Sequence, residues 1–156
     1  NPEWYDGASS DRSVDLGFMG SFDSDSARGR VLAELGNLVA CRRRTGEPGA
    51  YKDYADFMLR CRATVNVAHS AGDGAMHVKA RCVEAAWAGC MLFESAGSPL
   101  GRWIPHTCFY EYQNPAEVAA VVQRLDFKYM AKCYGQRLRE AMQPHHPRHF
   151  WERVIG

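Results

Sequence analysis

The chain has 156 residues, with 19 basic and 18 acidic side chains and a formal net charge of +1. A chain of this length removes roughly two-thirds of its unfolded surface from water, which is enough for one compact domain. The near-neutral charge provides no global field to attract nucleic acid or an anionic membrane, so any anion site must be local.

The first 13 residues are polar and rich in turn formers, and they predict a linker or lead-in before a domain at residues 14–156. The chain starts without an initiator Met, which suggests a piece of a longer protein. Its six cysteines show no CxxC pair and no zinc spacing, so we interpret them as reduced thiols, mostly in the core, of a cytoplasmic protein. No apolar run approaches the roughly 20 residues of a membrane span, and no signal peptide is visible.

Apolar runs and helical spacing alternate along the rest of the chain. In chain order the pattern predicts a strand at 14–19, a helix at 28–39, a weak arginine-rich strand at 39–44, a helix at 51–62 and a strand at 63–68. It then predicts a helix at 76–88, strands at 90–93 and 108–112, helices at 114–125 and 128–142, and a short amphipathic tail at 148–155.

This alternation indicates right-handed βαβ units. We therefore expect an α/β, Rossmann-like single domain with a parallel sheet of about five to six strands and helices on both faces. Ligands of such sheets bind beyond the carboxyl ends of the strands. The loops of interest are consequently 20–27, 69–75 and 94–107.

The predicted helix at 76–88 carries a polar stripe on an otherwise apolar surface. On a helical wheel His77, Arg81 and Glu84 fall within about 60° of one another. Arg81 and Glu84 could satisfy each other as a local ion pair. Alternatively, the helix start and the cations His77, Lys79 and Arg81 bind a diphosphate, and Glu84 accepts hydrogen bonds from the attached ribose.

The segment from Val65 to Ser95 also has a family resemblance. Val65-Asn66, Lys79-x-Arg81-x-x-Glu84 and Ala88-Gly89-Cys90 resemble the carboxyl-terminal domain of group-1-type glycosyltransferases with the GT-B fold, especially a bacterial subset. Tyr110-x-Tyr112 before Asn114-Pro115 looks like the last strand and following helix of that domain, and the tail at 146–151 resembles its crossing helix. The resemblance covers roughly residues 14–155.

The resemblance implies that the domain binds a nucleoside-diphosphate sugar, such as a UDP-sugar. Glu84 would bind the donor ribose, the basic residues Lys79, Arg81 and His77 would bind the diphosphate, and Gly20-Ser21 after the first strand would face the phosphates. No metal is needed if the protein itself supplies the positive charges, so we expect neither a metal nor a cofactor, with the nucleotide sugar as substrate. Catalytic residues are not assigned, because the acceptor-binding amino-terminal domain of the family has no counterpart in these residues, and the chain alone should be inactive.

One departure from the family leaves a second hypothesis open. Many retaining members carry another Glu eight positions before the ribose-binding one, and Met76 stands there in this chain. The alternative is a non-catalytic nucleotide-binding or assembly module that keeps the GT-B half-fold.

Other candidate sites are weaker. Asp23-Ser24-Asp25 has the spacing of a metal motif but is interpreted as a loop, and Cys108 beside His106 is interpreted as a chance neighbour without a nucleophile elbow. His145, His146 and His149 lack a carboxylate or Cys at ligand spacing, and we expect them on the surface.

Overall fold

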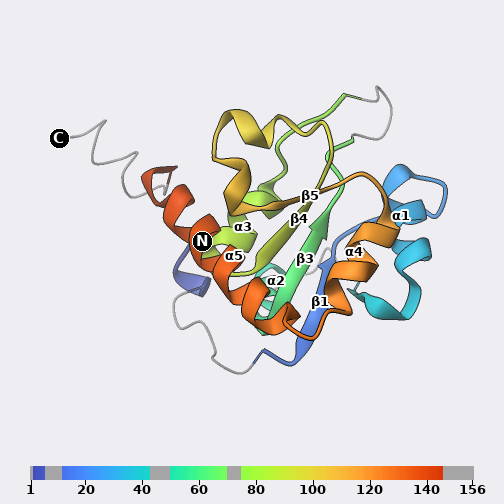
Figure 1. Ribbon diagram of the computed structural model, residues 1–156, viewed down its shortest axis with the longest axis horizontal. Coiled ribbons are helices and arrows are strands. Elements are labelled where there is room, and N and C mark those ends of the chain that lie inside the picture. Colours follow the sequence, from blue (N-terminus) through green and yellow to red (C-terminus); the bar gives the residue numbers. More distant parts are fainter. Residues whose placement is uncertain (1, 6–11, 43–49, 70–74, 146–156) are drawn as a thin grey trace.

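The computed structural model of the protein describes residues 2–5, 12–42, 50–69 and 75–145, in which strands and helices alternate (Figure 1). The strands are β1 (Val14–Met19), β2 (Ala40–Arg42), β3 (Cys61–Asn66), β4 (Met91–Ser95) and β5 (Tyr110–Tyr112). The α-helices are α1 (Ala27–Leu35), α2 (Ala50–Arg60), α3 (Ala80–Ala88), α4 (Pro115–Val122) and α5 (Phe127–Met142). Short 3-10 turns occupy η1 (Pro2–Tyr5), η2 (Gly36–Leu38), η3 (Pro99–Arg102), η4 (His106–Cys108) and η5 (Gln143–His145).

All strand pairs that the structure describes are parallel, and they form one five-stranded sheet in the order β2-β1-β3-β4-β5. The central strands are buried on both faces, as apolar β-rich runs in parallel sheets usually are. The predicted α/β, Rossmann-like single domain is therefore confirmed, with five strands.

Helices cover both faces of the sheet, and each face has its own core (Figure 1). Leu32 and Leu35 of α1 pack with Val118 and Val121 of α4 on one face. Helices α2 and α3 fill the opposite face, α2 mainly with large side chains such as Phe57 and Met58 and α3 with small residues. The long helix α5 begins in the first core with Phe127 and ends in the second, so it passes beneath the amino ends of the central strands (Figure 1).

Local signals place several of these helices. Ser26 caps α1 by accepting a hydrogen bond from the Gly29 amide, and Asn114 caps α4 in the same way, with Pro115 in the first turn. Helix α3 stops at Gly89, whose left-handed backbone (φ 64°) suits glycine and turns the chain into β4.

The prediction for the start of α3 was wrong by four residues, because this helix begins at Ala80 and not at 76. The residues just before Ala80 pair with the residues that follow β3. His69 and Met76 form an isolated antiparallel bridge, and the His77 amide donates to the Ala68 carbonyl. Tertiary hydrogen bonds thus override helical propensity here. The weak strand at 39–44 exists as the short, exposed edge strand β2.

Parts of the predicted lead-in pack on the domain. Tyr5 of η1 is buried, and its ring lies 5.8 Å from the ring of Trp87 on α3. Arg12 donates hydrogen bonds to the carbonyls of Cys61, at the start of β3, and Ala88, at the end of α3. The tail at 146–156, including the resemblance to a crossing helix, lies outside the described residues.

The six cysteines are free thiols, and four of them lie in the core, in agreement with their expected role as small apolar residues. None of the helices in the described part of the chain is both long and apolar enough to span a bilayer.

Candidate functional site

The strand order places a switch point between β1 and β3. The chain leaves β1 for α1 on one face of the sheet and leaves β3 for α3 on the other, so the two following loops diverge. In open parallel sheets of this order, ligands bind in the crevice that this divergence opens at the carboxyl ends of the strands.

The side chain of Arg81 reaches into this switch point from α3. Its guanidinium group donates to the carbonyl of Met19 at the end of β1 and, at 3.2 Å, to the carbonyl of Val65 near the end of β3. The same group lies over the ring of Phe18, 3.9 Å from the ring centroid. Arg81 therefore links two strand ends from the α3 side and meets a ring that belongs to the opposite core.

A second cation, Arg28, approaches the Phe18 ring from α1, which packs on the opposite face of the sheet from α3. Its guanidinium carbon is 5.8 Å from the Phe18 centroid, and it donates to the Ser21 carbonyl at 2.8 Å. Partial burial, and next the charge of Arg81, lower the pKa of Arg28. Neither guanidinium forms an ion pair with a carboxylate among the described residues, so positive charge accumulates here.

Gly20 and Ser21 lie directly beside these cations. A side-chain carbon on Gly20 would approach the Arg81 guanidinium to 3.0 Å, and the Gly20 amide donates to the Arg42 carbonyl of β2. The structure thus brings three predicted diphosphate-binding residues, Gly20, Ser21 and Arg81, to one place. Arg28 was not among the residues predicted from the sequence. A basic residue in the first helical turn after a glycine loop could have indicated it.

Glu84 lies half-buried one turn further along α3, between two tyrosines. Burial is the main reason why the pKa values of Tyr54 and Tyr5 are raised, and the Glu84 carboxylate raises them further. The Tyr54 hydroxyl of α2 accepts a hydrogen bond from Arg81 at 3.5 Å, and it lies close enough to Glu84 for the carboxylate to raise its pKa. Among the described residues, no direct ion pair joins Arg81 and Glu84 in the polar stripe predicted on this helix.

His77 and Lys79 precede α3 and do not belong to its stripe. His77 is exposed, and its amide is held by Ala68. Lys79 is the N-cap residue with an extended backbone (φ −88°, ψ 153°) and makes no side-chain cap bond. Among the described residues, the contacts of the switch point connect Gly20, Ser21, Arg81 and Glu84 and do not include His77.

A buried carboxyl group lies at the ends of the two neighbouring strands. The Asn66 amide donates to both carboxyl oxygens of Glu94, at 3.2 and 2.9 Å, and the Cys82 thiol lies 3.4 Å from the same group. Glu94 is fully buried, and this burial raises its pKa. The sequence did not reveal this group, because Glu94 directly follows the apolar run 90–93 and resembles the first residue of a loop.

Stability should therefore fall with rising pH in a way that depends on Glu94. An unfolded Glu titrates near pH 4.3, so the native state binds the extra proton above that value, and stability is lost as the pH rises through the raised native pKa. We expect Glu94→Gln to remove this component. Urea unfolding of both proteins at pH 5 and pH 8 measures it, and an unchanged difference between the two pH values would contradict the assignment.

The Asp23-Ser24-Asp25 segment forms a turn that is closed by hydrogen bonds to its own side chains. The Asp25 amide donates to the Asp23 carboxylate at 3.1 Å, and the Ser24 hydroxyl contacts both carboxylates. Across the described ranges, no group of three His, Cys, Asp or Glu side chains has the geometry of a metal site.

Neither a protein-family model nor a curated protein matches this sequence.

Proposed function

We propose that this chain is the nucleotide-sugar-binding domain of a GT-B-fold glycosyltransferase. It would transfer a sugar from a nucleoside-diphosphate donor to an acceptor when joined to an amino-terminal, acceptor-binding half. The observation that carries the proposal is the pair of guanidinium groups of Arg28 and Arg81 at the switch point, beside Gly20 and without an ion-paired carboxylate in the described structure. Guanidinium pairs of this kind are suited to phosphate oxygens.

Arg81 is held in place before a ligand arrives. A guanidinium group has five N–H donors, and Arg81 uses three of them for Tyr54, Val65 and Met19. The remaining two donors, together with Arg28, would face the diphosphate. Fixed cations that need no rearrangement stabilise the charge that develops on a leaving nucleoside diphosphate.

Glu84 would bind the ribose of the donor. Its carboxylate lies behind Arg81 on the same helix and is half-buried next to Tyr54. A carboxylate accepts hydrogen bonds from two vicinal hydroxyl groups, and Tyr54 would keep its orientation. The free thiols fit a reducing compartment, so the proposal places the protein in the cytoplasm.

Glu84→Ala tests the donor role. Hydrogen bonds to a charged group contribute about 1.5–3 kcal/mol, so we expect the affinity for the cognate nucleotide sugar to fall roughly 10- to 100-fold. Calorimetric titration against UDP-, GDP- and TDP-sugars measures it, with circular dichroism to verify the fold. Glu140→Ala, on the exposed side of α5, is the matched control and should leave affinity unchanged. Unchanged affinity in a folded Glu84→Ala protein would refute the proposal.

The alternative is a nucleotide-binding or assembly module without transfer activity. Position 76 favours this alternative, because many retaining members of the family carry a carboxylate there. In this chain the position is occupied by Met76, whose thioether lies against Gly97. Assaying sugar transfer by the longest natural chain that contains these residues separates the two functions. Nucleotide binding without turnover supports the module, and turnover supports the glycosyltransferase.

A further inference from the structure

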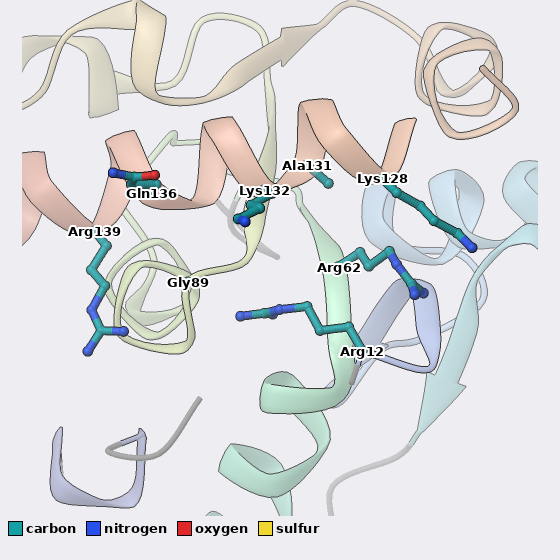
Figure 2. A pocket seen from close by; sticks show the side chains of 8 residues that line it. All are labelled: Arg12, Arg62, Gly89, Lys128, Ala131, Lys132, Gln136 and Arg139. Atoms are coloured by element: carbon teal, nitrogen blue, oxygen red, sulfur yellow. The ribbon is translucent and has the colours of Figure 1, made fainter. Parts of the chain in front are cut away.

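A cavity lies at the end of the sheet opposite to the switch point. It has a volume of about 420 Å³, within the range of small-molecule sites. Arg12 precedes β1, Arg62 is near the start of β3, and Gly89 precedes β4, so this cavity opens at the amino ends of the strands. Figure 2 shows Arg12 and Arg62 on the sheet side, opposite the side chains of α5.

Helix α5 provides a continuous polar stripe along the cavity. Lys128, Lys132, Gln136 and Arg139 recur at intervals of four, four and three residues, so they share one helix face. The stripe spans about 16 Å at 1.5 Å per residue. Three of its four members are cations, and like charges one turn apart repel each other when no anion lies between them.

The sheet side of the cavity is rigid. The Arg12 guanidinium is bound to the carbonyls of Cys61 and Ala88 and contacts the Cys90 thiol. Arg62 forms a 2.9 Å ion pair with Asp15. Helix α5 is fixed against this wall because Gly135 packs directly on the Gly89 carbonyl. A ligand would thus meet cations that are already positioned.

The charges lining the cavity are not balanced. Five cations line it, and Asp15, through Arg62, is the one carboxylate paired with any of them in the described structure, which leaves an excess of about four positive charges (five minus one). No ion pair of Lys128, Lys132 or Arg139 is found among the described residues. A recess lined by one sign of charge concentrates ions of the opposite sign.

We infer that this cavity, the basic pocket, binds a small anion with two or more phosphate groups. One phosphate would neutralise about two of the excess charges, and the length of the α5 stripe suits a chain of phosphates more than a single one. Lys ammonium and Arg guanidinium groups are the common protein ligands of phosphate oxygens. The site is separate from the switch point and does not depend on the proposed donor function.

Titration calorimetry with sodium tripolyphosphate tests the basic pocket, with inorganic phosphate as the comparison that carries a single phosphate group. Tripolyphosphate should bind more tightly than phosphate, and Lys128→Gln/Lys132→Gln should weaken its binding at least 10-fold. Both lysines are exposed, so the variant is expected to fold. The matched control is Arg102→Gln/Arg137→Gln, which removes two exposed cations outside the pocket and should change affinity less than 2-fold.

Two outcomes would overturn the inference: no measurable tripolyphosphate binding, or equal losses in the two double variants. The source of the phosphates is resolved by flotation with phosphatidylcholine vesicles containing phosphatidylinositol 4,5-bisphosphate, a lipid whose headgroup carries more than one phosphate. Binding to these vesicles that needs Lys128 and Lys132 assigns the pocket to a phosphorylated headgroup. Binding of tripolyphosphate alone assigns it to a free polyphosphate.

Discussion

Gly135→Ala is expected to destabilise the protein by about 3 kcal/mol or more, although the same change in an ordinary helix stabilises it by 0.5–1 kcal/mol. A methyl group at Gly135 would lie 2.2 Å from the Gly89 carbonyl oxygen and 2.8 Å from its carbon. Both atoms belong to the main chain that leads into β4, so they cannot rotate away. Helix α5 would have to move off the sheet and lose the burial of Leu138 and Met142.

Unfolding in guanidinium chloride, followed by circular dichroism, measures this loss of stability. Small domains have 5–15 kcal/mol of stability in total, so a loss of this size is easily resolved. Glu140→Ala, an exposed residue of the same helix outside the basic pocket, should change stability by no more than about 0.5 kcal/mol. If Gly135→Ala were as stable as the parent, the close approach of α5 to β4 would be wrong, and the rigid wall of the basic pocket with it.

The sequence predicted the fold well because the decisive signals are local. The apolar run at 14–19 coincides with β1, and Asn114-Pro115 gives both the cap and the first turn of α4. The start of α3 was misplaced because the extended backbone of Lys79 depends on a bridge between His69 and Met76, which no local pattern reveals.

The candidate site was predicted in part. Arg81 and Glu84 share a helix, so their spacing alone placed them on one face. The partners of that face come from other elements: Tyr54 from α2, and Phe18 from β1. The position of Arg28 beside Arg81 depends on the strand order, which brings the ends of β1 and β3 together, and spacing along one helix cannot show it.

The basic pocket was invisible to sequence reasoning for the same reason. Its cations are spread from Arg12 to Arg139, and only the passage of α5 beneath the strands brings them together. The balanced total of 19 basic and 18 acidic residues hides both cationic sites. A near-neutral chain thus concentrates positive charge at the two ends of one sheet, with the apolar core between them.

Arg81→Met should reduce stability and nucleotide binding together. The variant leaves the carbonyls of Met19 and Val65 without their donor, and each unsatisfied buried group costs about 1–3 kcal/mol, so a total loss of roughly 3 kcal/mol is expected. It also removes a cation from the proposed diphosphate site, and nucleoside-diphosphate affinity should fall at least 100-fold, about 2.7 kcal/mol.

Arg28→Met separates these two effects. Arg28 is bound to one exposed main-chain carbonyl, that of Ser21, so its loss should cost less than about 1 kcal/mol of stability. Its charge still faces the proposed diphosphate, so affinity should fall about 10-fold. Chemical denaturation and calorimetric titration of both variants provide the comparison. If folded Arg81→Met and Arg28→Met proteins bind nucleoside diphosphates as the parent does, the paired guanidiniums are a structural clamp between β1 and β3, and the donor site must be sought elsewhere.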